Sequence, residues 1–143
     1  MSIDKYNSER YYEPTAYKAL SAIEEKERKL HVFRPLVYVC SPYAGDIQKN
    51  VKKAQHYCRY VVKKGYIPIA PHLLFTQFLD DSNPDERVLG LHFGNALMSK
   101  CREVWVFGNK VTNGMSIEIA KAKRNGQTIR YFTESCEEVS GNE

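Results

Sequence analysis

The stretch from Leu36 to Gly45 constrains the fold more than any other part of the chain. It reads LVYVCSPYAG, five apolar or aromatic residues followed by Ser, Pro, Tyr, Ala and Gly. A continuous apolar run that ends in turn residues is typical of a buried strand in a parallel sheet. The Ser41–Gly45 turn then lies at the carboxyl edge of that strand, which is where ligands bind in open α/β sheets.

Three further segments have strand-like composition, and segments with helical spacing separate them. Strands are predicted at Tyr66–Ala70, Glu103–Phe107 and Thr128–Phe132. Pro68 cannot donate to a ladder, which indicates an edge strand or a bulge. Helices are predicted at about 48–64, 84–100 and 115–124. This alternation predicts an α/β, three-layer doubly wound fold, flavodoxin-like or Rossmann-like, with a mostly parallel sheet of four to five strands.

The chain divides into three predicted regions. Residues 1–35 are an N-terminal helical extension, with a helix expected at 14–31 and a thin apolar stripe along it. This helix either packs on the flank of the domain or forms a subunit contact. Residues 36–133 are the α/β domain, and residues 134–143 form an acidic tail that we expect to be frayed.

Composition limits the partners that the chain can have. The 143 residues carry a net charge of +4 with 43% hydrophobic residues, which is typical of a globular protein. No apolar run reaches the roughly 20 residues of a membrane span, and the N-terminus has no apolar signal region, so a cytoplasmic location is expected. Lys and Arg are scattered rather than clustered, which does not favour a nucleic-acid partner, while a modest positive excess suits an anionic small ligand.

The cysteines and histidines do not show the spacing of a metal site. Cys40, Cys58, Cys101 and Cys136 form no C-x-x-C pair, so reduced and mostly buried thiols are expected, with no metal bound. The chain also lacks the dinucleotide fingerprint G-x-G-x-x-G and the Walker P-loop. We therefore expect no cofactor.

Two turns each follow a predicted strand and open a predicted helix. The first runs from Ser41 to Asp46, and the second from Thr112 to Glu118. Gly45 and Gly114 permit close backbone approach, and helix starts present free N–H groups to an anion. The alternative interpretation is ordinary turn chemistry, in which Gly, Ser and Pro simply reverse the chain.

Acidic and imidazole side chains near these turns are candidates for chemistry. Glu118 lies about one turn into its helix between apolar neighbours, either partly buried toward the strand ends or simply favoured by the helix dipole. Asp80, Asp81 and His72 follow the second strand and could protonate a leaving base or hold a sugar hydroxyl. Capping aspartates and a satisfied histidine are the alternative. Tyr43 and Met115 could cover a base or ribose, or could be ordinary packing residues.

From Val37 to Phe132 the chain resembles the nucleoside 2-deoxyribosyltransferase-like superfamily, and most closely its branch labelled DUF4406. Four segments in order carry the resemblance: YVCSPYAGD, GYIPIAPHLLFTQFLDD, CREVWVFG and NGMSIEIAKAKRNGQTI. The resemblance implies a flavodoxin-like core, a nucleoside or nucleotide ligand and assembly into homo-oligomers. It leaves the N-terminal helix unexplained.

The resemblance also implies roles for individual residues. Glu118 matches the nucleophile, which follows a glycine of the helix start by four residues, here Gly114. The first turn, which holds the sugar or phosphate in that superfamily, is occupied here by Ser41, Pro42, Tyr43 and Gly45. The transferases carry an Asp shortly before the glycine, whereas this chain has Thr112 and Asn113. Thr112 could instead hold a phosphate, as serine does in the related nucleotide N-glycosidases.

Three functions stay open at this point. The first is an enzyme that cleaves or transfers an N-glycosidic bond through Glu118, which forms a glycosyl ester as retaining glycosidases do. Asp80, Asp81 or His72 would then assist departure of the base. The second is a non-catalytic nucleotide binder, a sensor or sponge, which the neutral Thr112–Asn113 pair favours. The third is a structural or interaction domain with a vestigial pocket.

Overall fold

The computed structural model describes residues 14–30 and 33–140, which divide into two compact units, Met1–Phe33 and Arg34–Glu143. In the first unit, helix α1 spans Pro14–Leu30, as the apolar spacing predicts. Leu20, Ile23 and Leu30 are all exposed along it. Whether α1 contacts the domain or another subunit stays a prediction, as do the regional boundaries at 35 and 133.

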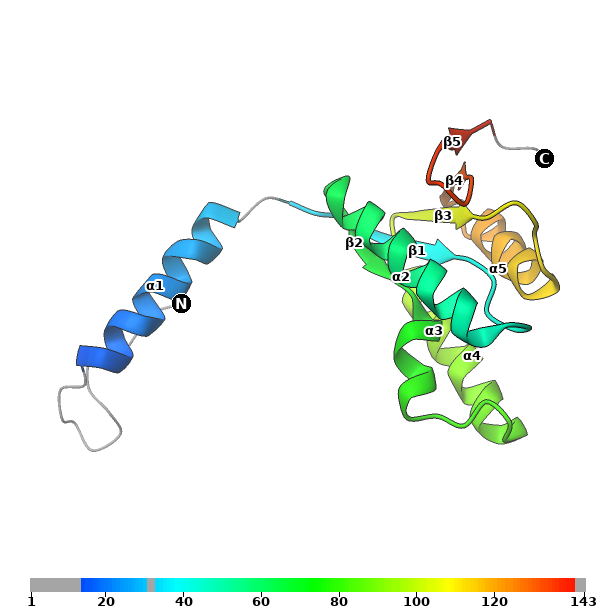
Figure 1. Cartoon of the computed structure of the whole chain (residues 1–143), viewed down its shortest axis with the longest axis horizontal. Coiled ribbons are helices and arrows are strands. Elements are labelled where there is room, and N and C mark those ends of the chain that lie inside the picture. The colour runs from blue at the N-terminus through cyan, green and yellow to red at the C-terminus, as the bar shows by residue number, and fades with distance from the viewer. Residues whose placement is uncertain (1–13, 31–32, 141–143) are drawn as a thin grey trace. The chain divides into compact units, whose positions relative to one another are not determined.

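The second unit is an α/β domain built on one five-stranded sheet (Figure 1). Its strands are β1 (Leu36–Cys40), β2 (Ile67–Ile69), β3 (Glu103–Phe107), β4 (Thr128–Phe132) and β5 (Glu138–Val139). They lie in the order β2-β1-β3-β4-β5, and only the β4–β5 pair is antiparallel. This is the flavodoxin-like order, which confirms the predicted fold class.

The helices of the domain begin and end near the predicted residues. They are α2 (Ile47–Lys63), the short α3 (Pro71–Leu74) with the 3-10 turn η1 (Phe75–Gln77), α4 (Pro84–Ser99) and α5 (Asn113–Arg124). Side chains cap three of them: Asp46 accepts from Lys49 N, Asn83 from Asp85 N and Glu86 N, and Thr112 from Met115 N. Such caps satisfy N–H groups that have no partner within the helix.

Alternation along the strands divides the core into two faces of the sheet. Tyr38, Cys40, Val104 and Val106 pack on one face with residues of α4 and α5. The other face is largely aromatic and packs against α2; its buried members are Val37, Val39, Tyr57, Val61, Trp105, Phe107 and Phe132. The two faces therefore follow from the two-residue period of β1 and β3.

The two edge strands of the sheet, β2 and β5, bear on the sequence predictions. Pro68 lies in β2, which is the edge strand as expected. The acidic tail was predicted to be frayed. That prediction is wrong for residues up to 140, because Glu138–Val139 forms β5 and joins the sheet. Arg130 explains this pairing: its Nε and Nη2 donate to both Glu138 carboxylate oxygens at 2.8 and 2.7 Å. Bidentate pairing of this kind is strong and geometrically specific.

Candidate functional site

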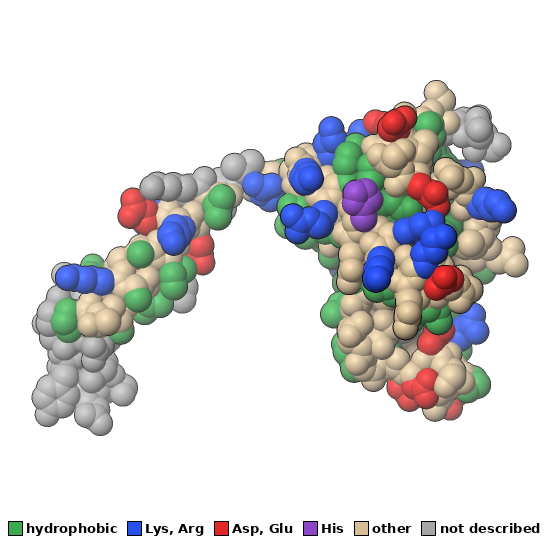
Figure 2. Space-filling view, viewed as in Figure 1, with side chains coloured by type: hydrophobic (Ala, Val, Ile, Leu, Met, Phe, Trp, Pro, Cys, Tyr) green, Lys and Arg blue, Asp and Glu red, His purple; other side chains and the backbone are tan. Residues whose placement is uncertain are grey.

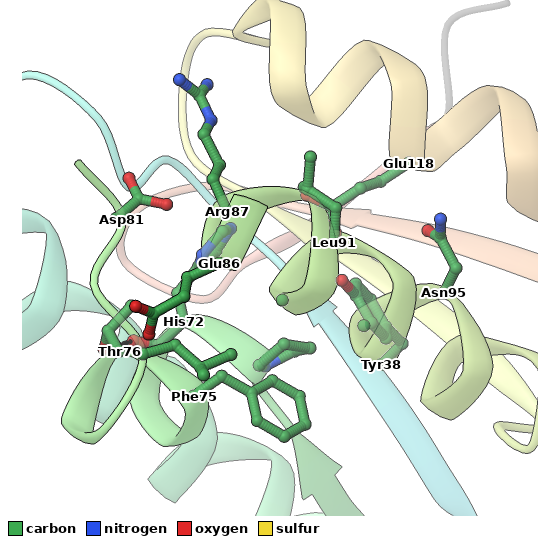
Figure 3. A pocket seen from close by; sticks show the side chains of 14 residues that line it. Tyr38, His72, Phe75, Thr76, Asp81, Glu86, Arg87, Leu91, Asn95 and Glu118 are labelled. Atoms are coloured by element: carbon green, nitrogen blue, oxygen red, sulfur yellow. Dashed lines mark hydrogen bonds between the residues drawn. The ribbon is translucent and has the colours of Figure 1, made fainter. Parts of the chain in front are cut away.

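A cavity opens near the carboxyl ends of β1 and β2, between the α3–η1 segment, α4 and α5 (Figure 3). Fourteen residues line it, among them Tyr38 from β1, His72 from α3, Asp81 from the following loop and Glu118 from α5. The cavity has a volume of about 60 Å³. A ligand as large as a nucleoside would therefore extend beyond it.

Glu118 lines this cavity together with two other carboxyl groups, those of Asp81 and Glu86. Its neighbours Met115, Ile119 and Ala122 are buried against the sheet, which holds α5 in place and leaves Glu118 half-buried facing Tyr38 (Figure 3). Burial raises the pKa of Glu118 from 4.5 to about 7, and the interactions with the Tyr38 hydroxyl and with Lys121 act in the opposite direction. A carboxyl group with this pKa exists in both protonation states near neutral pH.

His72 lies at the opposite wall and stacks on Tyr43. The two ring centroids are 4.6 Å apart with 13° between the planes. Burial lowers the pKa of His72, and Asp81 acts against that effect, so the imidazole is mainly neutral at neutral pH. Thr76 Oγ1 donates to the His72 carbonyl oxygen at 2.6 Å, which fixes the turn that carries the ring.

The two neighbouring aspartates have different surroundings. Asp81 lines the cavity. Asp80 does not line it, because its carboxylate accepts hydrogen bonds from Ser82 N at 2.9 Å and Ser82 Oγ at 2.6 Å. These two bonds lower the pKa of Asp80. Asp80 is therefore the turn residue of the alternative interpretation, while Asp81 keeps its place as a candidate for chemistry.

None of the eight residues predicted to bind the ligand lines the Glu118 cavity, although Tyr43 lies behind its His72 wall. Ser41 is buried, and Gly45 adopts φ 98° in the turn before α2. Asn50 Nδ2 holds this turn by donating to the Tyr43 and Ala44 carbonyls, both at 3.0 Å. Asn50 therefore anchors the first turn to α2.

The residues of the second turn form the N-terminus of α5. Thr112 is the cap, Asn113 is the first helical residue and Gly114 follows it. Met115 cannot cover a base as predicted, because its side chain is 1% exposed and packs in the core. The sequence could not distinguish these alternatives, since a methionine in the first turn of a helix can face either way.

The two turns are nevertheless neighbours at the same edge of the sheet. Pro42 and Thr112 line a second hollow of about 300 Å³, together with Lys53, Lys110 and other residues of α2 and the turn after β3. The carboxylate in this hollow is Glu134, whose Oε1 lies 2.6 Å from Lys53 Nζ. The carboxylate beside the two turns is therefore Glu134, whereas Glu118 lines the other cavity.

Sequence reasoning missed the contribution of β1 and α4 to the cavity. Tyr38 comes from the strand itself, and Arg87, Leu91 and Asn95 recur every four residues on one face of α4. Gly94 lies on the same face, where an added Cβ would be 3.6 Å from Pro71 and 3.8 Å from the Tyr38 hydroxyl. The available signal was the pair of glycines, Gly90 and Gly94, on the face of α4 that also carries Arg87 and Asn95.

The described residues contain no group of three His, Cys, Asp or Glu side chains that could hold a metal ion. All four cysteines are free thiols, of which Cys40 and Cys101 are buried. None of the described helices is long and apolar enough to cross a membrane.

Comparison with known proteins places this chain in a family. Residues 35–132 match the model of a domain of unknown function, DUF7768. The chain belongs to the DUF7768 family. No curated protein matches this DUF7768 protein. The DUF4406 branch expected from the sequence stays a prediction.

Two solved structures share the fold of this DUF7768 protein. One is described as a 2-deoxyribosyltransferase from Bacillus psychrosaccharolyticus, with a TM-score of 0.56 and 16% identity over 74% of this chain and 77% of that one. The other is a 2-desoxiribosyltransferase from Leishmania mexicana, with a TM-score of 0.51 and 12% identity over 69% of this chain and 64% of that one. These likenesses confirm the predicted α/β fold.

Proposed function

We infer that this DUF7768 protein cleaves or transfers the N-glycosidic bond of a nucleoside or nucleotide, with Glu118 as the nucleophile. One observation carries this proposal: the Glu118 carboxyl group lies in an open cavity with Tyr38, His72 and Asp81 near the carboxyl ends of two parallel strands. The fold shared with two proteins described as 2-deoxyribosyltransferases supports it.

The proposed reaction proceeds in two displacements. A Glu118 carboxylate oxygen attacks the anomeric carbon, the C–N bond breaks, and the base leaves with the bonding electron pair. The glycosyl ester on Glu118 is then attacked by water or by a second base, which restores the carboxylate and retains the configuration. The Tyr38 hydroxyl stabilises the charged form of Glu118 before attack and after release.

The departing base needs a proton donor or a hydrogen-bond donor. His72 and Asp81 are the candidates in the cavity wall, and Asp80 is not, because Ser82 occupies its carboxylate. Stacking on Tyr43 holds the plane of the His72 ring. We assign His72 the role of orienting the base through a hydrogen bond, and Asp81 that of holding a sugar hydroxyl.

The proposal makes the pH dependence of the reaction specific. The attacking form of Glu118 is the carboxylate, and burial raises its pKa to about 7. The rate should therefore rise as the pH increases through about 7 and then level off. A nucleophile with an unshifted pKa would give a rate that is already level above pH 5.5.

Release of free base from a panel of nucleosides and nucleoside monophosphates, followed by chromatography, tests the proposal. Glu118→Gln should abolish release while the protein stays folded, because the amide is a poor nucleophile of the same shape. Glu137→Gln is a matched control, since that carboxylate is exposed. Absence of release by the unmodified protein from every compound in the panel would contradict the enzymatic proposal.

The non-catalytic binder is the second candidate, and one observation favours it. The Thr112 hydroxyl is used to cap α5, accepting from Met115 N at 3.3 Å, and Asn113 brings no charge where the transferases carry an acid. Calorimetry with the same compounds distinguishes the two functions. Binding without release of base, unchanged in Glu118→Gln, supports a sensor or sponge.

Assembly into a homo-oligomer and a cytoplasmic location remain proposals that come with this function. Sedimentation of the purified protein tests the first.

A further inference from the structure

Helix α2 carries an unusual concentration of positive charge. Six Lys or Arg residues and no acidic residue occur between positions 47 and 79. Five of the six lie within α2 (Ile47–Lys63), and Lys64 caps its C-terminus. The next seven positions, 80–86, carry four acidic residues and no basic one. Charge in this domain is therefore segregated along the chain, although the net charge of the whole chain is only +4.

The positive side chains of α2 share one face of the helix. At 100° per residue, Lys49, Lys52, Lys53, Arg59 and Lys63 fall within an arc of about 120°. The buried residues Ala54, Tyr57 and Val61 fall in a separate arc of about 60°. We call these five cations the basic stripe. Lys and Arg side chains lie over α2 in the space-filling view, with a histidine among them (Figure 2).

Fold stability does not explain the basic stripe. Lys49 and Lys52 lie in the first turns of α2, where the helix dipole disfavours cations. Like charges three or four residues apart also destabilise a helix, by about 0.2–0.5 kcal/mol for each pair. Within the part of the chain that the structure describes, an ion pair is formed by Lys53 with Glu134, whereas Lys49, Lys52 and Arg59 form none and are exposed.

The geometry selects among polyanions. The stripe extends from Lys49 to Lys63, about 21 Å at 1.5 Å per residue, so it matches a linear array of negative charges. A membrane surface fits less well, because amphipathic helices bind membranes by inserting an apolar face. The apolar face of α2 is already packed against the sheet through Tyr57 and Val61.

We propose that the basic stripe of α2 binds the phosphate backbone of a nucleic acid. Contact is with phosphate and sugar rather than base edges, so the binding is independent of sequence. This inference does not depend on the proposed glycosidic chemistry. It differs from the expectation from composition, in which nucleic acid is not favoured as a partner, because five of the cations lie on one face of a single helix.

The salt dependence of binding gives a quantitative test. Lys53 is paired with Glu134, so four cations of the basic stripe remain to contact phosphates. Four contacts predict a slope of log K against log salt of about −3 for a single strand and about −3.6 for a duplex. The probes are a fluorescein-labelled 20-nucleotide single strand of mixed sequence and the corresponding duplex, each titrated with the full chain at 50 to 200 mM KCl and followed by anisotropy. The probe that binds more tightly identifies the preferred form of the backbone.

Two triple variants with the same change in net charge distinguish the effect of the basic stripe on binding from the effect of net charge. K49Q/K52Q/R59Q removes three stripe cations and should weaken binding at 50 mM KCl at least tenfold and reduce the slope. K100Q/K123Q/R124Q removes three exposed cations at the ends of α4 and α5 and should change affinity less than threefold. Circular dichroism checks that both variants are folded.

Three results would overturn the proposal. These are no binding of either probe at 50 mM KCl, equal weakening by the two triple variants, and binding to vesicles of anionic lipid but not to nucleic acid.

Discussion

The two faces of the central sheet are formed by the same strands but pack against different kinds of side chain. On one face, Trp105, Phe107 and Phe132 pack with Tyr57 and the ring planes of Phe107 and Phe132 are 18° apart. On the other, Tyr38 points a hydroxyl toward Glu118. The aromatic face consists mainly of packed rings, and its polar partners, Arg130 over Trp105 and the Glu103 carboxylate on Trp105 Nε1, are at its margin. The face toward α4 and α5 instead holds a carboxyl group that burial makes unfavourable as an ion.

This difference indicates where stability and function reside. Large buried rings contribute most of their free energy by leaving water. A half-buried carboxyl group contributes the opposite once it ionises. The aromatic face should therefore determine how stable the domain is, and the site face should determine how that stability and the chemistry vary with pH.

Phe107→Ala should produce the largest loss of stability. The side chain is fully buried between Tyr57 and Phe132, and such truncations cost about 3–5 kcal/mol. Urea unfolding followed by the fluorescence of Trp105, which is the single tryptophan, measures it. Phe78→Ala is the matched control, because Phe78 is 63% exposed and should cost less than about 0.5 kcal/mol. Similar losses for both variants would remove the distinction.

Glu118→Gln should change the pH dependence of stability. The pKa of Glu118 in the folded protein is about 7, above its ordinary value of 4.5, so folding favours the protonated form. That contribution is complete below about pH 4.5 and is lost as the pH rises through 7. Glu118→Gln has no group that ionises at this position. The stability of the variant relative to wild type should therefore be roughly 1–3 kcal/mol higher at pH 8 than at pH 4.5.

Urea unfolding at pH 4.5 and 8 measures both proteins. A constant difference between wild type and Glu118→Gln across this range would show that Glu118 is not shifted by burial.

Tyr38→Phe should raise the pKa of Glu118 further, because the Tyr38 hydroxyl favours the carboxylate. The loss of this polar partner should cost about 1 kcal/mol at pH 8 and less at pH 4.5. Carboxyl ¹³C chemical shifts of labelled protein, recorded against pH, report the change directly. An unchanged or lower midpoint for Glu118 would mean that the two groups do not interact.

Glu134→Gln should have the smallest effect on stability of the four substitutions. Its pH dependence should be opposite in sign to that of Glu118→Gln. Lys53 lowers the pKa of the exposed Glu134 carboxyl group, so its contribution is present above the ordinary value near 4.5 and is lost as the pH falls. Wild type and variant should therefore differ slightly at pH 7 and converge at pH 3.5 in the same unfolding measurement. A loss as large as that of Tyr38→Phe would make this exposed pair more important than its surroundings suggest.

Local patterns in the sequence predicted most of the fold. Leu36–Cys40, Glu103–Phe107 and Thr128–Phe132 form strands over the predicted residues, because a buried strand between turns is visible as an apolar run. The β5 strand was missed since two residues, Glu138 and Val139, carry no period, and their pairing depends on Arg130 eight residues earlier. That contact is tertiary and has no local signature.

The site was predicted less completely for a similar reason. Glu118, His72 and Asp81 were candidates, but spacing along the chain does not show which hollow a side chain enters. Pro42 and Thr112 line the hollow with Lys53 instead. Tyr38 was assigned only to the strand, since a tyrosine in an apolar run gives no sign of its polar partner.

Covalent capture of Glu118 tests the central claim most directly. The full chain is incubated with a 2-fluoro-2-deoxynucleoside, whose fluorine slows breakdown of a glycosyl ester, and is then analysed by intact-protein and peptide mass spectrometry. The account predicts one fluorinated sugar added per chain, attached to the peptide that contains Glu118 and absent from Glu118→Gln. Attachment at another residue, or release of base without any dependence on Glu118, would contradict it.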